Sequence, residues 1–187
     1  MSQNTILLID IETTGLEPKS GKIVEVGIVT LNLETGEINT IMDVVCHETG
    51  ITKQEVEESW IVKNGYITLE EVRHSQNFSN LKPVIQKIID CYPTGATAFN
   101  REFDFRFLKD RGITFPKELP CPMLLSTDIC KLPGKYENKH KWPKAQEAYD
   151  HFFPQSEYKE KHRGADDAFH EAQIVHELYK IGVFKIN

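Results

Sequence analysis

The first apolar run of the chain is interrupted by two acids. Residues 6–12 contain five apolar side chains in seven positions, and a Thr-Thr-Gly turn follows, so residues 5–15 predict a short strand buried on both faces. Side chains alternate between the two faces of a strand, and Asp10 and Glu12 therefore point to the same side at its end. Either the two carboxylates hold a cation, for which oxygen ligands favour Mg²⁺ or Mn²⁺, or the strand has reached the surface and both acids are solvated.

Two β-branched runs continue the pattern. Residues 22–31 and 38–46 predict a second and a third strand, and the connections at residues 15–21 and 32–36 are short and rich in turn-forming residues. Consecutive strands with short turns between them pair as an antiparallel meander. The first strand is then placed to pair with later strands.

Helical periodicity dominates the middle of the chain. Residues 52–59 predict a short helix, and Thr68 is a candidate N-cap of another, with acids in its first turn. Apolar side chains at helical spacing predict an amphipathic helix over residues 80–91, with Pro83 tolerated in its first turn.

Strands and helices alternate in the second half. Residues 96–99 predict a short buried strand that delivers Asn100, and residues 101–111 predict a helix that ends at a Gly C-cap. Phe103 is expected to be a core residue of that helix. After the irregular, proline-rich residues 113–122, we expect one more strand at residues 124–129.

Two helices complete the chain. Residues 142–153 predict a helix with Pro143 at its start, residues 154–161 form a charged connector, and residues 165–181 predict a long amphipathic helix. No repeat or linker divides the sequence, so we expect a single domain over residues 1–187. The whole pattern predicts the α/β class, with a mixed five-stranded sheet, an antiparallel meander plus parallel strands, flanked by helices.

Composition bounds the function without deciding it. The chain has 22 basic and 28 acidic side chains, a net charge of −6, and it has no basic block of the kind that binds duplexes non-specifically. Four scattered cysteines without a C-x-x-C pair argue against a zinc site or disulfides. No apolar run is long enough to span a membrane, and the N-terminus lacks a signal peptide, so we expect a cytoplasmic protein.

Acidic residues recur at predicted element ends, where reactive groups of α/β sheets collect. Such acids either cap helices or converge on one site, and a histidine at one of these ends either lies in the core or at the surface, or acts as a base. The candidates are Asp10, Glu12, Asp104, His162, Asp166 and Asp167. Basic residues nearby are either solvated or contact phosphate, and they are Lys135, Lys139, His140, Lys141, Lys144, Lys159, Lys161 and Arg163.

Three segments resemble the motifs of a known family. The segments D-I-E-T-T-G at 10–15, N-R-E-F-D at 100–104 and H-R-G-A-D-D-A at 162–168 are similar to the three motifs of DEDDh 3′–5′ exonucleases. That family includes the proofreading epsilon subunit of bacterial DNA polymerase III, RNase T and TREX-type nucleases. The resemblance implies a ribonuclease H-like fold, two Mg²⁺ or Mn²⁺ ions and stepwise removal of nucleotides from a 3′ end.

The resemblance also assigns roles to single residues. Asp10, Glu12, Asp104 and Asp167 match the four metal-ligating acids, and His162 matches the general base. In a two-ion mechanism, Asp10 would bridge the ions, Glu12 and Asp167 would serve the ion that activates water, and Asp104 the leaving-group side. Asp166, one residue short of the family's spacing, is left as a helix cap or a supporting residue.

Substrate contacts follow from the same comparison. The backbone after Glu12, with Thr13 and Thr14, is expected to meet the terminal sugar, Gly15 to permit close approach, and Leu16 to wedge near the last bases. Asn100 orients the phosphate or forms a turn. The chain departs from many relatives at Phe99, where they have His or Tyr, and at Arg163-Gly164 after the histidine. These departures affect substrate fit and helix packing more than the chemistry.

The sequence leaves three functions open. The first is a metal-dependent exonuclease that releases nucleoside 5′-monophosphates from the 3′ end of nucleic acid, with single-stranded DNA as the expected substrate. The second is an exoribonuclease of the RNase T or oligoribonuclease kind. The third is a non-catalytic module that binds a polymerase or helicase, which the complete acid set disfavours. The expected partner is nucleic acid with a free 3′ end, with a polymerase or another replication or repair protein as a candidate, and no membrane.

Overall fold

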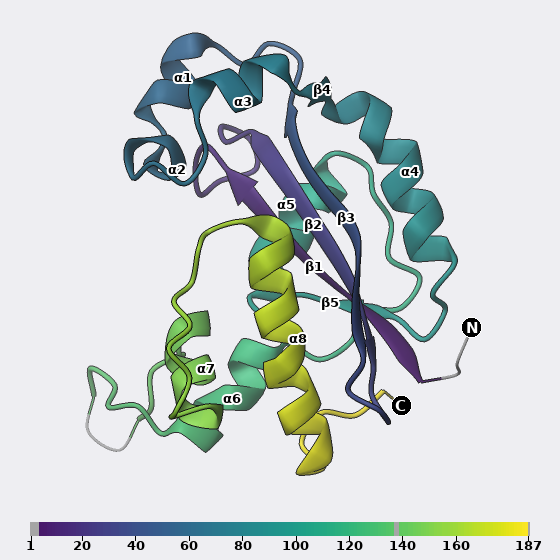
Figure 1. Cartoon of the computed structure of the whole chain (residues 1–187), viewed down its shortest axis with the longest axis vertical. Coiled ribbons are helices and arrows are strands. Elements are labelled where there is room, and N and C mark those ends of the chain that lie inside the picture. Colours follow the sequence, from purple (N-terminus) through teal and green to yellow (C-terminus); the bar gives the residue numbers. More distant parts are fainter. Residues whose placement is uncertain (1–3, 137–138, 187) are drawn as a thin grey trace.

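A mixed sheet forms the centre of the computed structural model, which describes residues 4–136 and 139–186. Among these residues the sheet has five strands in the order β4-β3-β2-β1-β5 (Figure 1). The strands are β1 (Thr5–Thr13), β2 (Ile23–Asn32), β3 (Ile38–His47), β4 (Gln76–Asn77) and β5 (Ala96–Thr97). Strands β1, β2 and β3 pair antiparallel, whereas β5 joins β1 and β4 joins β3 in parallel. The predicted α/β class and the predicted sheet are confirmed.

The fifth strand is not the one that the sequence predicted. Residues 124–129 lie within helix α6 (Pro122–Cys130), and the fifth strand is the short β4. A short apolar run does not by itself distinguish a strand from a buried helix. The distinguishing feature is Pro122 at the first helical position, where its fixed φ angle favours a helix and its missing N–H is not needed.

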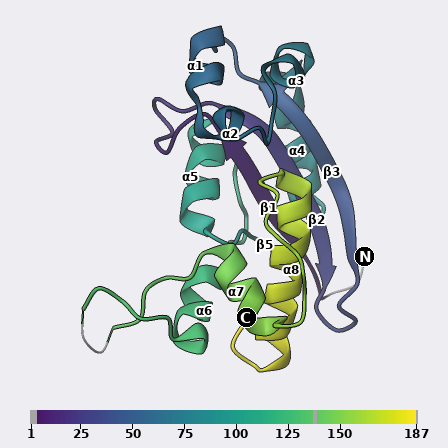
Figure 2. The same ribbon diagram turned by 60° about the vertical axis from the view of Figure 1, so that its left-hand side comes forward.

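Helices cover both faces of the sheet, as two views of the molecule show (Figures 1 and 2). Helices α4 and α5 pack on one face, and α7 and α8 pack on the other. Besides α6, the helices of the described residues are α1 (Lys53–Glu58), α2 (Trp60–Lys63), α3 (Leu69–His74), α4 (Phe78–Asp90), α5 (Arg101–Asp110), α7 (Ala145–Phe152) and α8 (Gly164–Lys180). None of them is long and apolar enough to cross a membrane.

Several helix boundaries differ from the prediction. Helix α4 begins earlier than expected because the Asn77 side chain accepts a hydrogen bond from the Ser79 N–H, so Pro83 lies inside the helix instead of in its first turn. Helix α7 begins at Ala145, which leaves Pro143 outside it. The four-residue helix α2 was not predicted. The helices expected near residue 53 and after Thr68 are present, and each has a capping box.

Alternation along β1 decides which face receives its acids. Leu7 and Ile9 belong to the apolar cluster with α4 and α5, whereas Ile6 and Leu8 belong to the cluster with α7 and α8. Because side chains alternate, Asp10 continues the series of even-numbered residues. The acids at the end of β1 therefore lie on the face that α8 covers.

The start of α8 is fixed against β2 by a contact that admits only glycines. A Cβ added to Gly27 would lie 2.0 Å from the carbonyl carbon of Gly164, and a Cβ on Gly164 would lie 2.7 Å from the Gly27 nitrogen. The buried Glu25 carboxylate strengthens this contact, because it accepts hydrogen bonds from the Gly164 N–H at 3.1 Å and from Arg163 Nε at 2.9 Å. The first turn of α8 is thereby held beside the end of β1.

We expect Gly27→Ala to lower the free energy of unfolding by about 1–3 kcal/mol, because the added methyl group overlaps backbone atoms that cannot move without shifting α8. Urea denaturation measures the change. The matched control is Gly15→Ala, where a Cβ would make an ordinary contact of 3.5 Å with Gly21. Equal stabilities of the two variants would contradict the proposed close contact between β2 and α8.

Candidate active site

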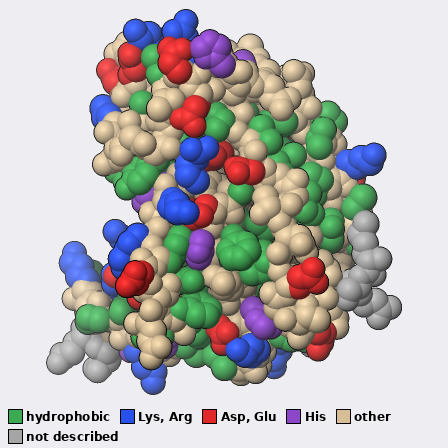
Figure 3. All heavy atoms as spheres, viewed as in Figure 1, with side chains coloured by type: hydrophobic (Ala, Val, Ile, Leu, Met, Phe, Trp, Pro, Cys, Tyr) green, Lys and Arg blue, Asp and Glu red, His purple; other side chains and the backbone are tan. Residues whose placement is uncertain are grey.

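A cleft of about 380 Å³ opens where β1 ends. It lies among the end of β1, the start of α5, the segment before α7 and the segment before α8, and Figure 3 shows this side of the molecule hollowed at its edge. Its lining residues include Asp10, Glu12, Phe99, Asn100, Phe103, Asp104, Met123, Trp142, Lys144, Glu160, His162, Asp167 and Glu171. The cleft therefore collects acids from three elements that are distant in the sequence.

Asp104 is tied directly to the strand that carries the first two acids. Its Oδ1 atom accepts a hydrogen bond from the Ile11 N–H at 3.2 Å, and its side chain is buried, at 4% exposure. Ile11 lies between Asp10 and Glu12, so this bond fixes the first turn of α5 beside both carboxylates. The position of Asp104 relative to β1 follows from one backbone contact.

Asp167 is held by the segment that precedes α8. Its carboxylate accepts hydrogen bonds from the Arg163 N–H at 3.0 Å, the Lys161 N–H at 3.2 Å and the Tyr158 hydroxyl at 2.8 Å. Asp166 instead pairs with the Lys161 ammonium group at 2.7 Å and does not line the cleft. The two acids share the Tyr158 hydroxyl, which also lies 3.0 Å from Asp166 Oδ2, but only Asp167 lines the cleft.

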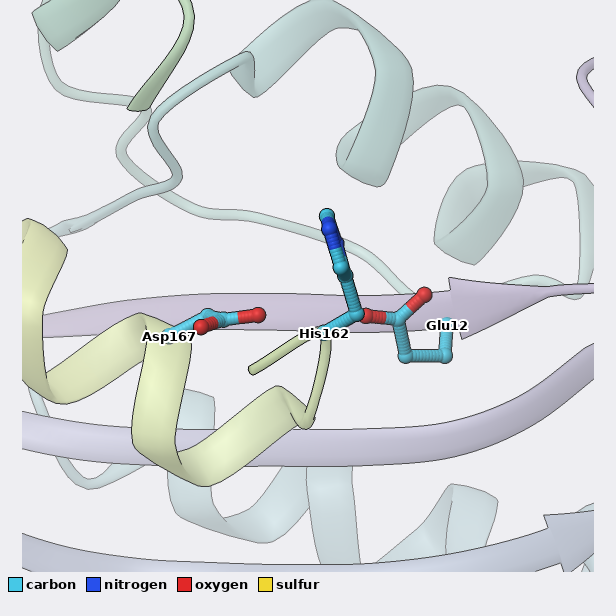
Figure 4. A group of neighbouring side chains, drawn as sticks. All are labelled: Glu12, His162 and Asp167. Carbon is cyan, nitrogen blue, oxygen red and sulfur yellow. The ribbon is translucent and has the colours of Figure 1, made fainter. Parts of the chain in front are cut away.

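His162 lies between two carboxylates on one side and two aromatic rings on the other. One ligand atom each of Glu12, His162 and Asp167 lies within 4.8 Å of the others (Figure 4). The ring centroids of Trp60 and Tyr66 lie 4.7 and 4.5 Å from that of His162, both edge to face. His162 has a left-handed backbone, with φ of +51°, a conformation that the surrounding contacts must maintain.

The electrostatics of the cleft favour protonated carboxyls and a neutral imidazole. Burial, followed by repulsion from neighbouring acids, raises the pKa of Glu12 to about 9. Burial likewise raises the pKa of Asp104 to about 8 and that of Asp10 well above its usual value. Burial also holds the pKa of His162 below its usual value, against the attraction of Asp167. At neutral pH the imidazole is therefore free to accept a proton.

The four motif acids of the cleft lack a Lys or Arg partner in the part of the chain that the structure describes. Among the described residues, Asp10, Glu12, Asp104 and Asp167 form no ion pair with Lys or Arg. Buried carboxylates without cationic partners are unfavourable in the ionised form. A divalent cation would relieve this repulsion, and carboxylate oxygens with one imidazole suit a hard or borderline ion. The donor set therefore fits the ions that the sequence predicted.

The structure places the other predicted substrate residues in two groups. Asn100 lines the cleft, and Phe103, expected in the core, is only half-buried and also lines it. The Thr13 and Thr14 hydroxyls bond within the following turn, to the Gly15 carbonyl and the Lys22 N–H. Thr13, Thr14, Gly15 and Leu16 lie outside the cleft lining, and the Leu16 side chain is 78% exposed.

Most of the candidate basic residues near the cleft have other partners. Arg163 pairs with Glu25 and Glu71, and Lys161 pairs with Asp166. Lys144 is the basic residue that the described structure places in the cleft lining. The departure from the family at Arg163-Gly164 is explained by the contacts with Glu25 and Gly27, which anchor the segment after His162.

Sequence reasoning missed two acids of the cleft. Glu171 lies one helical turn after Asp167 and is buried, and Glu160 precedes His162 in the connector. Burial raises the pKa of Glu160 to about 7, and it raises that of Glu171 well above the usual value. The spacing of four residues from Asp167 is typical of one helix face and could have pointed to Glu171. Glu160 follows no helical or strand periodicity that would have identified it.

Comparison with known proteins identifies the family. The family model described as Exonuclease, of the RNase T type, matches residues 7–175. The chain belongs to this exonuclease family. The DEDDh-type 3′–5′ exonuclease predicted from the three motifs is confirmed at the level of family and enzyme class, and this family uses divalent metal ions. No curated protein sequence matches the chain.

Solved structures share the fold of this exonuclease at low sequence identity. The nuclease domain of 3′hExo, a DEDDh family member bound to rAMP, has a TM-score of 0.65 at 19% identity, over 98% of this chain and 96% of that one. A 3′-exonuclease that recognises a histone mRNA stem-loop has a TM-score of 0.66 at 18% identity, over 98% and 85%. Exonuclease I of E. coli, in complex with a dT13 oligonucleotide, has a TM-score of 0.60 at 12% identity.

The chain does not span all of its structural relatives. The match with Exonuclease I includes 94% of this chain but only 41% of Exonuclease I. The match with a full-length 3′-exonuclease includes 61% of that protein. The shared part is thus the nuclease domain. Exonuclease I and the nuclease of the histone mRNA stem-loop bind nucleic acid.

We expect the metal-free exonuclease to lose stability as the pH rises. The raised pKa values of Glu12, about 9, and Asp104, about 8, lie above those of the unfolded chain, near 4. The stabilisation that the protonated acids give the folded state is fully present below pH 4. It is lost as the pH rises from there through about 8 to 9, and the free energy of unfolding falls by about 1.4 kcal/mol per pH unit for each proton that the folded state keeps and the unfolded state has released. Thermal unfolding in chelator between pH 5 and 9 measures this loss.

Added Mn²⁺ or Mg²⁺ should remove most of that pH dependence, because the cation offsets the repulsion between ionised carboxylates. Glu12→Gln should flatten the profile in chelator, whereas Glu177→Gln, which lies near the end of α8 and outside the cleft lining, should not. A chelated wild-type protein whose melting temperature is the same at pH 5.5 and pH 8.5 would contradict the burial of these acids.

Proposed function

We propose that this exonuclease removes nucleoside 5′-monophosphates one at a time from the 3′ end of single-stranded DNA. The observation that carries the proposal is the convergence of five residues from the three motifs on one cleft. These residues are Asp10, Glu12, Asp104, His162 and Asp167.

The four acids are proposed to hold two divalent ions, Mg²⁺ or Mn²⁺. Asp10 is the candidate shared ligand, Glu12 and Asp167 serve the water-activating side, and Asp104 serves the leaving-group side. When bound, such ions activate water and neutralise charge on the scissile phosphate and the departing oxygen. The protein's contribution is to keep the carboxylates together in a buried site, where Asp104 is fixed by the Ile11 N–H and Asp167 by the segment before α8.

His162 is proposed to accept the proton of the attacking water. Its imidazole is neutral at physiological pH because burial lowers its pKa, which is the state that a general base requires. Trp60 and Tyr66 both pack edge to face against the ring, on the side away from the carboxylates, and restrict its orientation. The anchor of Arg163 on Glu25 fixes the backbone that follows.

The walls of the cleft favour a single strand. The Trp142 side chain at the cleft is 65% exposed, and Phe103 and Lys144 line the same space. Exposed aromatic rings stack on unpaired bases, and a lysine ammonium group neutralises a phosphate. A volume of 380 Å³ is that of a small-molecule site and suits a terminal nucleotide rather than a duplex.

RNA is the second candidate substrate. The fold likeness to structures bound to rAMP and to a histone mRNA stem-loop argues for it. Matched DNA and RNA oligonucleotides of one sequence, compared by kcat/KM, decide between the two sugars. We expect single-stranded DNA to be degraded faster, and a preference for RNA would replace DNA as the assigned substrate.

Purified protein with a 5′-labelled single-stranded oligonucleotide and Mn²⁺ should give a ladder that shortens from the 3′ end. Asp10→Ala should abolish the ladder, and so should chelator, because both remove the shared charge that holds the cations. The matched control is Asp90→Asn, which lies exposed at the end of α4 and outside the cleft lining, and should stay within a few-fold of wild type. Early release of the label as a mononucleotide from the 5′ end, or cleavage that persists in chelator, would contradict the proposal.

We expect His162→Ala to lower kcat by about 10²–10⁴-fold, the usual contribution of a general base, and to change KM little. Wild-type kcat should fall as the pH drops through the pKa of His162, which burial holds below the usual 6.5, because the imidazole then carries a proton. His151→Ala, on the exposed side of α7, serves as the control. An unchanged kcat in the His162 variant would exclude it as the base.

A further inference from the structure

Glu171 occupies an unusual position for a carboxylate. Helix α8 places it four residues after Asp167, so both side chains lie on the same face of the helix. It is only 5% exposed, and it lines the cleft together with the acids of β1 and α5. It belongs to none of the three exonuclease motifs.

The contacts of Glu171 do not explain why this buried position holds an ionisable carboxyl group. Its Oε2 atom accepts a hydrogen bond from the Phe99 N–H at 3.3 Å, which is the one hydrogen bond to its carboxylate among the described residues. Within the same residues it forms no ion pair with Lys, Arg or His. A glutamine could accept the same hydrogen bond through its amide oxygen without carrying a buried charge. The hydrogen bond from the Phe99 N–H therefore does not explain why the residue is a glutamate.

The neighbours of Glu171 are themselves acidic. Glu171 lines the same cleft as Asp10, Glu12, Asp104 and Asp167. An additional buried carboxylate beside Asp10 makes the metal-free cleft less stable, because its desolvation and repulsion are not offset by a basic side chain. The same charge becomes favourable when cations occupy the cleft.

We propose that Glu171 is a fifth acidic residue of the cation site, which strengthens the binding of divalent cations at Asp10 from the α8 side and destabilises the metal-free protein. The inference rests on the proposed function, because it requires divalent cations in the cleft. Glu171 acts as a positioning residue: its charge acts on the cations, and no proton transfer is assigned to it.

Mn²⁺ binding to the substrate-free protein tests the proposal independently of activity. The free ion is counted by electron paramagnetic resonance during titration of wild type and Glu171→Gln, a change that keeps shape and removes charge. We expect the affinity for Mn²⁺ to fall about 10–100-fold, the usual effect of losing a supporting partner of a metal site. In chelator, the melting temperature of the variant should exceed that of wild type.

Two further variants separate charge from packing. Glu177→Gln changes the same residue type on the same helix at a residue that pairs with Lys180, and it should leave both readouts unchanged. Glu171→Asp keeps the charge in a shorter side chain, and it should bind Mn²⁺ more tightly than Glu171→Gln. It also provides a second test if the glutamine variant does not fold.

The outcomes distinguish this inference from the proposed function. Wild-type affinity in Glu171→Gln, together with lost affinity in Asp10→Asn, would overturn the role of Glu171 and leave the exonuclease proposal standing. Equal loss in the Gln and Asp variants would assign the effect to packing and would also overturn it. A wild-type protein that binds no Mn²⁺ and degrades no oligonucleotide would overturn both proposals.

Discussion

Repulsion between buried carboxylates is the constraint on which the rest of this structure depends. Strand β1 carries the half-buried Asp10 and Glu12 to the cleft, and α5 and α8 bring the buried Asp104 and Asp167 to the same place. Burial raises the pKa values of all four acids, repulsion from neighbouring acids adds to this at Asp10 and Glu12, and both effects weaken the metal-free fold. An arrangement with this energetic penalty is understandable if a cation completes it, which is the basis of the proposed function.

The remaining fold supplies the contacts that hold the acids against this repulsion. The Ile11 N–H fixes Asp104, and three donors from the segment before α8 fix Asp167. The contact between Gly27 and Gly164 places α8 against the sheet. The contacts of Asp167 are local, but the Ile11–Asp104 bond and the Gly27–Gly164 contact join residues far apart in the sequence, so the site exists only when the sheet and both helices are assembled.

The sequence predicted the fold where local patterns carry the information. Alternation along β1 predicts that Asp10 and Glu12 share one side of the strand, and both line the same cleft, while apolar periodicity indicates β2, β3 and most helices. The α6 segment was assigned to a strand because a short apolar run has no distinctive period. The spacing from Asp167 could have pointed to Glu171. Glu160 and the contacts of Trp60 with His162 could not be found in this way, since they depend on how the segment before α8 and α2 pack. The motifs themselves indicated the residues that the structure collects in the cleft.

Diffraction from crystals of wild-type protein soaked in Mn²⁺, recorded where manganese scatters anomalously, is the most direct test of the central claim. We predict anomalous density from manganese inside the cleft, in contact with the carboxylates of Asp10, Glu12, Asp104 and Asp167. A cleft that holds no manganese at a saturating concentration, or crystals in which Asp104 or Asp167 turns away from Asp10, would contradict it.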